Sequence, residues 1–387
     1  MAPELALAHL SDLHKGQVVL DPMSGSGTVL RQALALGHTA HGFDMDPLAV
    51  LMSRVWTSAV NDAAVEGLFK QVMADAKKAK SIVLPWIDND PETKAFAKYW
   101  FGDTQRRELR RLAFVLAQYA DDAKSGRDRA TVNVLRLALS RIIISKDTGA
   151  SLGHDISHSR PHKVMESNDY NVYAGYERSV LTIRKRLSDE PAGPVAAKVN
   201  LGDARRLRRL TNCSVDAVLT SPPYLNAIDY LRGHRLSLIW LGHRLSDLRV
   251  IRSNSIGSER GPDKASDAVE LAAMKFAMGD FASLPERFAR MIDRYVQDLY
   301  RMIKELSRVL KPGGKATFVV GNSCLRGIFI KNAGAVETAA ILSGLRMSKR
   351  VERDLPQQNR YLPITKDGAL GKRMRTETIL SFTKQAA

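Results

Sequence analysis

A serine, two prolines and a tyrosine lie together at residues 221–224, within the run Thr-Ser-Pro-Pro-Tyr that begins at residue 220. Ser221 offers a hydroxyl oxygen, Pro222 a backbone carbonyl held by a rigid ring, and Tyr224 an aromatic face. A planar heterocycle with an exocyclic amine needs this set, because two acceptors bind the amine hydrogens and the ring stacks on the aromatic face. The residue types therefore indicate a pocket for a base. The structural alternative is a plain strand-terminating turn with a core tyrosine.

The segment before this motif fixes where such a pocket must lie. Residues 215–219, Val-Asp-Ala-Val-Leu, are an apolar run that predicts a buried strand. Neither Pro222 nor Pro223 has a backbone N–H to donate, so the strand has to end at the motif. Open α/β sheets bind their ligands at the carboxyl ends of the strands. The sequence therefore predicts a pocket at that edge of a sheet.

A second loop with ligand-binding chemistry lies at residues 21–28, Asp-Pro-Met-Ser-Gly-Ser-Gly-Thr. It joins a predicted strand, residues 18–20, to a predicted helix, residues 29–36. Gly25 and Gly27 permit close backbone approach and positive φ. The loop lacks both the third glycine of a dinucleotide loop and the lysine of a Walker loop. An acid beside glycine backbone instead suits a ligand that carries an amine and a carboxylate.

An acidic residue completes this half of the site. A strand predicted over residues 38–43 ends at Asp44, which comes 23 residues after Asp21. In dinucleotide-binding folds, an acid roughly 20 residues after the glycine loop binds the ribose. Loop and acid together therefore indicate a ribose-containing ligand.

Five segments of the chain carry a family resemblance. Residues 21–28 and 220–224 resemble motifs I and IV of the S-adenosylmethionine-dependent amino-methyltransferases of DNA. Residues 42–47, Gly-Phe-Asp-Met-Asp-Pro, are similar to motif II, and residues 202–204, Gly-Asp-Ala, resemble motif III, whose acid usually contacts the adenine of the cofactor. Residues 309–320 look like the helix end, turn and fifth strand of Rossmann-like methyltransferases. The resemblance covers residues 3–60, 199–245 and 290–385.

The resemblance implies an α/β fold: a Rossmann-like, doubly wound and mostly parallel sheet with an antiparallel closing hairpin, plus a helical insertion. It implies S-adenosyl-L-methionine as the cofactor and the exocyclic amine of a flipped base as the methyl acceptor. The cofactor-binding residues that it implies are Asp21, Pro22, Met23, Gly25, Gly27, Thr28, Asp44, Asp46, Asp203 and Ala204. The catalytic residues are Ser221, Pro222, Pro223 and Tyr224.

Polar residues after the motif are candidate substrate contacts: Asn226, Asp229, Tyr230, Arg232 and Arg235. The first three are within reach of the Watson–Crick edge of the base, although Asn226 or Asp229 could instead cap a helix predicted over residues 231–241. The two arginines project from that helix and could meet the phosphate of an extruded nucleotide.

The chain divides into three predicted parts. Residues 1–60 are the cofactor-binding half, residues 61–198 a mainly helical insertion that is a candidate for target recognition, and residues 199–387 the catalytic half. Within the last part, residues 243–265 are polar and Gly/Ser-rich and predict a loop. Loops longer than about 15 residues in a compact domain usually have a function. This loop and residues 91–168 are the two candidates for reading a DNA sequence.

The insertion offers two further clusters of functional side chains. Helices are predicted over residues 48–80, 91–147 and 170–186, with a separate helix at about 129–145 inside the second range. Four arginines fit a solvated helix face and phosphate contact equally well: Arg106, Arg107, Arg110 and Arg111. Three histidines follow with a spacing of four: His154, His158 and His162. Because Pro161 and nearby glycines break a helix and no cysteine or acid completes a zinc set, we expect a basic loop and no metal site.

The last part of the chain contains alternating helix and strand patterns. Helices are predicted over residues 291–310 and 335–343, and a strand over residues 315–320. Residues 347–353 and 377–382 are predicted to pair as closing strands. Between them, the polar segment 355–361 resembles family segments near the target base.

The composition indicates a polyanionic partner. The 387-residue chain has 58 Lys and Arg against 41 Asp and Glu, a net charge of +17, and such an excess attracts nucleic acid. Two cysteines, Cys213 and Cys324, are too few for a disulfide scaffold and fit a reducing cytoplasm. Neither follows a proline, as the nucleophile of carbon-5 cytosine methyltransferases does, which favours transfer to an exocyclic nitrogen. No apolar stretch approaches about 18 residues and no secretion signal is evident, so we expect neither membrane insertion nor export.

The favoured function is site-specific methylation of duplex DNA, with the target base flipped and N4 of cytosine as the acceptor. In the family, Ser-Pro-Pro-Tyr most often accompanies N4-cytosine methylation and Asp-Pro-Pro-Tyr accompanies N6-adenine methylation. The alternatives are an N6-adenine DNA methyltransferase, an RNA base methyltransferase and a catalytically silent nucleic-acid-binding module. A cognate restriction endonuclease is a candidate partner. The sequence departs from the family at Met23, where many members have an aromatic residue, and none of the 20 residues before Asp21 clearly matches motif X.

Overall fold

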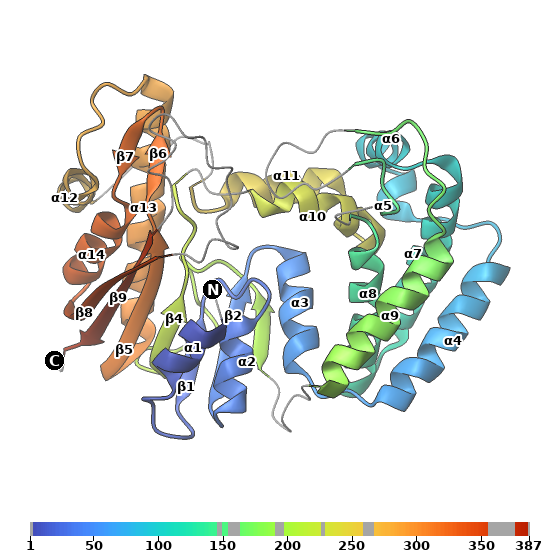
Figure 1. Cartoon of the computed structure of the whole chain (residues 1–387), viewed down its shortest axis with the longest axis horizontal. Coiled ribbons are helices and arrows are strands. Elements are labelled where there is room, and N and C mark those ends of the chain that lie inside the picture. The colour runs from blue at the N-terminus through green and yellow to red at the C-terminus, as the bar shows by residue number, and fades with distance from the viewer. Residues whose placement is uncertain are drawn as a thin grey trace. The chain divides into compact units, whose positions relative to one another are not determined.

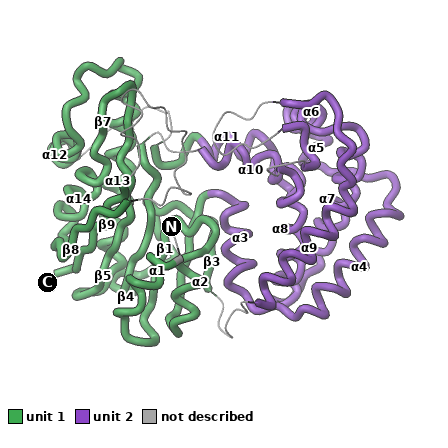
Figure 2. Tube along the Cα trace, in the orientation of Figure 1, with its two compact units in different colours: residues 1–45, 197–227, 253–387 green, residues 46–196, 228–252 purple. Residues whose placement is uncertain are grey.

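The structure, a computed structural model, describes residues 3–144, 149–153, 163–189, 197–225, 229–257, 267–354 and 376–385. The chain forms two compact units (Figure 2). The sheet unit contains residues 1–45, 197–227 and 253–387, and the helical unit contains residues 46–196 and 228–252. Each unit has a large hydrophobic cluster of its own. The functional division at residues 60 and 198 stays a prediction.

The described residues of the sheet unit form a seven-stranded sheet in the order β3-β2-β1-β4-β5-β9-β8 (Figure 1). The first five strands in this order are parallel, whereas β9 runs antiparallel to both β5 and β8. The predicted fold class, a mostly parallel sheet with an antiparallel closing hairpin, is therefore confirmed. The strands are β1 Val18–Asp21, β2 Thr39–Asp44, β3 Lys198–Leu201, β4 Val215–Thr220, β5 Leu310–Gly321, β8 Leu345–Asp354 and β9 Thr376–Lys384.

Side chains that alternate along β5 reach helices on both faces of the sheet. Phe318 and Val320 belong to the main cluster of the sheet unit, together with residues of α13 and α14. Val319 instead clusters with Leu5 of α1 and Ile379 of β9. This period of two is what a strand buried on both faces requires. The helices of the unit are α1 Pro3–Leu10, α2 Thr28–Ala35, α12 Ala268–Met278, α13 Glu286–Val309 and α14 Asn332–Leu342, and a small hairpin joins β6 Ser323–Leu325 to β7 Ile328–Ile330.

The helical unit confirms the helical character predicted for the insertion. Its helices are α3 Pro47–Thr57, α4 Asp62–Lys78, α5 Pro85–Asp88, α6 Pro91–Trp100, α7 Asp103–Asp122, α8 Gly126–Arg141, α9 Val172–Asp189, α10 Tyr230–Leu238 and α11 Leu245–Asn254, with a 3-10 turn, η1, at Ile239–Leu241. The apolar positions at helical spacing along α7 are buried, as predicted: Leu109, Leu112, Val115 and Leu116. Of the polar arginines, Arg110 forms an ion pair with Asp88 and Arg106 pairs with Asp103.

Two predicted segments are corrected by the structure. The single helix over residues 48–80 is wrong, because α3 ends at Thr57 and α4 begins anew with the side chain of Asn61 accepting from the amide of Ala64, at 3.0 Å. The predicted loop over residues 243–265 is wrong for α11, where Leu245 and Leu248 are buried. A leucine pair three residues apart was the signal for that helix. The rest of that segment beyond residue 257 lies outside the described residues.

Helix ends and small strands account for the other differences. The range 91–147 contains three helices, and α8 begins at a capping box formed by Ser125 and Asp128. Strand β3 and the β6–β7 hairpin were not predicted. The histidines at 154, 158 and 162 and the segment 355–361 lie outside the described residues. Within the described ranges, no helix is long and apolar enough to cross a membrane.

Candidate functional site

The two predicted motifs meet at the carboxyl edge of the sheet. Strands β1 and β4 are neighbours, with Leu20 opposite Val218. Each strand ends in a polar residue, Asp21 in β1 and Thr220 in β4. Thr220 Oγ1 donates a hydrogen bond of 2.9 Å to Asp21 Oδ1, although the two residues are 199 positions apart in the chain. The glycine loop and the Thr-Ser-Pro-Pro-Tyr motif therefore lie side by side, as the sequence predicts.

Asp21 is the buried acid of this pair. Its Oδ1 also accepts from the backbone amide of Met23, at 3.1 Å, and its side chain is 4% exposed. Burial raises the pKa of Asp21 from 3.8 to about 7, against the opposing effect of these two hydrogen bonds. The carboxyl is thus poised to ionise near neutral pH, and a bound cation would favour its charged form.

This acid makes stability depend on pH in a defined window. Between pH 3.8 and about 7 the folded state holds the Asp21 proton while the unfolded chain releases it. The free energy of unfolding therefore falls as the pH rises through this window and levels off above it. We expect Asp21→Asn, which has nothing to titrate, to gain on the order of 2–4 kcal/mol over the native chain between about pH 5 and pH 8. Urea unfolding at both pH values measures this difference, and two parallel pH profiles would show that Asp21 does not titrate there.

The glycine loop is held by the neighbouring strand. Gly25 and Gly27 have φ of +51° and +86°, the left-handed region that favours glycine. The amide of Gly25 donates to Asp44 Oδ2 over 2.9 Å, so the predicted ribose-binding acid faces this loop. Thr28 opens α2 directly after the loop, and Met23 packs against the main cluster. Pro22 is buried.

The candidate catalytic loop follows β4. Ser221 Oγ donates to the backbone carbonyl of Val319 in β5, over 2.9 Å. A hydroxyl has one proton, and this bond uses it, so the lone pairs of Ser221 stay available to accept from a ligand. Pro222 is buried, Pro223 is half-buried, and Tyr224 packs against the main cluster with part of its surface accessible.

A cavity of about 310 Å³ lies where β2 and β3 end. The two strands are joined there by a hydrogen bond of 2.9 Å from the amide of Gly202 to the carbonyl of Asp44. The cavity is lined by Met45, Asp203, Arg205, Arg206, Asn254, Arg294 and Arg301. Met45 supplies an apolar wall, Asp203 an acceptor, and the arginines a positive rim. The predicted motif III residue Ala204 is buried in the adjacent core.

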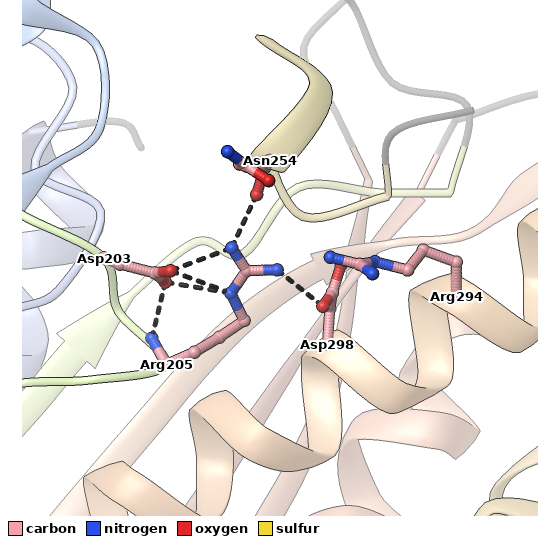
Figure 3. A network of polar contacts seen from close by, with 5 residues as sticks. All are labelled: Asp203, Arg205, Asn254, Arg294 and Asp298. Atoms are coloured by element: carbon pink, nitrogen blue, oxygen red, sulfur yellow. Dashed lines mark hydrogen bonds and ion pairs between the residues drawn. The ribbon is translucent and has the colours of Figure 1, made fainter. Parts of the chain in front are cut away.

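Arg205, whose side chain is 9% exposed, lines this cavity and forms a network of polar contacts (Figure 3). Arg205 donates to both carboxylate oxygens of Asp203, at 2.8 to 3.1 Å, and to Asp298 Oδ1, at 2.6 Å. Arg294 donates to the other oxygen of Asp298, at 2.8 Å, and the carbonyl of Asn254 accepts from Arg205 at 2.5 Å. Burial opposes the charge of Arg205, but the two acids outweigh it and raise its pKa.

The network has a consequence for Asp203. A carboxylate has about four acceptor positions, and Arg205 uses most of them through its side chain and its backbone amide. The Asp203 side chain is still 27% exposed, which leaves room for a ligand donor. Sequence reasoning did not find Arg205, Asp298 or Arg294, because their contacts join segments up to 93 residues apart.

The remaining predicted residues that the structure describes lie in the helical unit. Asp229 caps α10 by accepting from the amide of Arg232, and it pairs with Arg252. The capping alternative is therefore confirmed for Asp229. Tyr230 is 60% exposed, whereas Arg235 is half-buried with its guanidinium 5.1 Å from the centre of the Phe96 ring.

Asp46 likewise has structural partners in this unit. Its Oδ1 accepts from the amide of Leu48 at the start of α3, at 2.8 Å. Its Oδ2 lies 2.5 Å from Nδ1 of His234. Asn226 lies outside the described residues. Among the residues that the structure describes, no group of three His, Cys, Asp or Glu side chains could hold a metal ion.

Comparison with known proteins finds a curated methyltransferase that is similar to part of the chain. No protein-family model matches the chain. The chain is a distant relative of the type II methyltransferase M.BsoBI of Geobacillus stearothermophilus, with 24% identity over 270 residues, or 62% of this chain and 50% of the relative. It thus spans about half the length of that protein.

Solved structures give weaker likenesses. A protein of Thermus thermophilus, named as a candidate DNA modification methylase and solved with S-adenosyl-L-methionine, is 17% identical with a TM-score of 0.26, over 48% of this chain and 52% of that one. A SAM-dependent methyltransferase of Methanosarcina mazei is 10% identical with a TM-score of 0.34, over 100% of this chain and 99% of that one.

Proposed function

We propose that this protein is an S-adenosyl-L-methionine-dependent DNA methyltransferase that acts on the exocyclic amine of a flipped base, with N4 of cytosine as the favoured acceptor. The observation that carries the proposal is the hydrogen bond between Thr220 and Asp21, which joins the Thr-Ser-Pro-Pro-Tyr motif to the glycine loop. The distant relationship to a type II methyltransferase supports it independently.

The residues at this edge fit S-adenosyl-L-methionine. Its amino group is a cation, and Asp21 is a buried carboxyl that a cation would ionise. Asp44, beside the glycine loop, would accept from the ribose hydroxyls. The cavity of about 310 Å³ offers Met45 as an apolar wall and Asp203 as an acceptor for the adenine amine, and its size is typical of small-ligand sites, at roughly 300–1,000 Å³.

The catalytic loop suits an amine acceptor. S-adenosyl-L-methionine, when bound, supplies a methyl group on a positively charged sulfur, so that a C–N bond forms as the C–S bond breaks. Ser221 accepts one amine hydrogen, because its own proton is donated to Val319. The carbonyl of Pro222 accepts the other, and Tyr224 stacks on the base. These contacts orient the nitrogen lone pair, and the proton leaves for water once the new bond has made it acidic.

Methyl transfer to defined nucleic acids tests the proposal. The full chain is incubated with methyl-labelled S-adenosyl-L-methionine and either unmethylated genomic DNA or structured RNA, which are then digested to nucleosides for mass spectrometry. We expect label in DNA as N4-methylcytosine. Label found as N6-methyladenine would show that adenine is the methyl acceptor. Label found only in RNA would show that RNA, and not DNA, is the substrate. If the protein binds the cofactor but transfers no methyl group, it is a catalytically silent nucleic-acid-binding module and not an enzyme.

A further inference from the structure

The β6–β7 hairpin follows the carboxyl end of β5 (Figure 1). Leu325 pairs with Ile328, so Arg326 and Gly327 form a two-residue turn at its tip. Both turn residues have positive φ, +49° at Arg326 and +87° at Gly327. Turns of this kind favour Asn, Asp or Gly at both positions, and a side chain as long as arginine is disfavoured there. The conformation of the turn therefore does not explain why an arginine occupies this position.

The base of the hairpin is fixed to the candidate catalytic loop. Ser323 Oγ donates to the carbonyl of Leu225 over 2.6 Å, and Leu225 directly follows Tyr224. Asn332 Nδ2 donates to Ser323 Oγ at 2.8 Å and to the carbonyl of Gly321 at 3.0 Å. Three strand residues beyond this anchor, the tip is about 10 Å away. That length corresponds to about three base-pair steps along the axis of duplex DNA.

Positive charge gathers at the tip of the hairpin and on the neighbouring helix α13. Arg326 is exposed, and its guanidinium lies 5.8 Å from the centre of the Phe288 ring, while that of Arg287 lies 4.7 Å from the same ring. Within the described ranges, no carboxylate pairs with Arg326 or Arg287. Glu286, which precedes Arg287 in sequence, is itself paired with Arg290 at 3.3 Å.

We propose that this hairpin binds the phosphate backbone of duplex DNA beside the flipped base, with Arg326 and Arg287 as the phosphate contacts, an inference that rests on the proposed function. Phosphate is the expected ligand because a guanidinium matches its oxygens with two parallel hydrogen bonds. Such contacts do not depend on base sequence, and they fix the position of a protein on the duplex. Because Ser323 of the hairpin is hydrogen-bonded to Leu225, a hairpin fixed on the DNA also fixes the loop that receives the base.

Replacing Arg326 with asparagine separates binding from folding. Asparagine suits the left-handed turn, so Arg326→Asn should unfold at the same temperature as the native chain or higher. Its affinity for a mixed-sequence duplex of about 25 base pairs should fall about 3- to 10-fold, and the slope of log K against log salt should become shallower by about 0.9. Fluorescence anisotropy of the full chain at several NaCl concentrations measures both. Arg326→Lys keeps the charge and should retain the native slope.

Arg346→Gln is the matched control, because it removes the same charge from the same unit. Arg346 is exposed at the start of β8 and is in register, through Thr383, with Lys315. Lys315 lies six strand residues before the end of β5, so Arg346 is at least about 20 Å from the hairpin base. We expect Arg346→Gln to bind duplex DNA like the native chain.

The outcomes separate this inference from the proposed function. A native salt slope in Arg326→Asn, or an equal loss in Arg346→Gln, would overturn the role of the hairpin. A native chain that binds duplex DNA with the expected dependence on Arg326, yet methylates no nucleic acid, would keep the hairpin as a DNA contact and overturn the enzymatic proposal alone.

Discussion

Ser221→Ala should lower the rate of methyl transfer by about 10²- to 10³-fold, the loss typical of removing one preorganised hydrogen-bonding group at a reacting centre. Ser221 donates its proton to Val319, and the lone pairs of its oxygen therefore stay available to accept from an amine. Alanine removes that acceptor and leaves the carbonyl of Val319 without this donor, at a cost to stability of about 1 kcal/mol. Affinity for S-adenosyl-L-methionine should stay the same. Single-turnover transfer and cofactor titration of the same preparations measure the two effects.

A second serine, at the other end of β4, supplies the control. Ser214 precedes β4 at its opposite end, and its Oγ donates to the carbonyl of Thr211 over 2.7 Å. Ser214→Ala therefore loses the same kind of bond, far from the candidate site. We expect it to lose similar stability and to keep native transfer. If both variants slow transfer equally, Ser221 acts through stability and the catalytic assignment fails.

Asp44→Asn should weaken the binding of S-adenosyl-L-methionine by about 10- to 100-fold, because a charged acceptor for the ribose hydroxyls contributes about 1.5–3 kcal/mol. Asparagine keeps one side-chain oxygen, so the amide of Gly25 can still find its acceptor and the glycine loop should keep its shape. Isothermal titration calorimetry with S-adenosyl-L-methionine measures the change.

Asp216 provides a comparable carboxylate away from the site. It accepts from the backbone amide of Val18 over 2.8 Å and forms an ion pair with Lys311 at 2.7 Å, at the amino-terminal end of β4. Asp216→Asn should reduce stability without reducing cofactor affinity. If Asp44→Asn binds S-adenosyl-L-methionine as tightly as the native chain does, Asp44 does not contact the cofactor.

The sequence predicted the parts of the fold that have strong local signals. Apolar runs that stop at Asp21 and Thr220 identify two adjacent strands and their binding edge, and the short segment before Asp44 is predicted as the strand beside them. By contrast, β3 has only Val199 buried among its four residues, so its pattern is too weak to predict, and it becomes a strand by pairing with β2. The strands of the β6–β7 hairpin have three residues each, and an Arg-Gly turn is not among the usual hairpin signals.

Sequence patterns predict a candidate site residue most directly when it immediately follows a predicted strand. Asp46 shows the limit, because an Asp followed by Pro is also the usual start of a helix, and its carboxylate does cap α3. Arg205 could not be found from sequence. Its partner Asp298 is one acid among several on α13, and the folded sheet unit is needed to bring the two together at 2.6 Å.

The division of the chain into units bears on how such a protein can diversify. The helical unit is encoded by two separate stretches, 46–196 and 228–252, yet it has one core: Trp240 of the second stretch packs edge-on against Phe101 of the first, with ring centres 5.0 Å apart, and Trp86 donates to the carbonyl of Ile239 at 2.8 Å. Recombination that exchanges one stretch alone would mix two parental cores and misfold the chimera. Grafting both together preserves every packing partner, so the two stretches must be inherited as a pair.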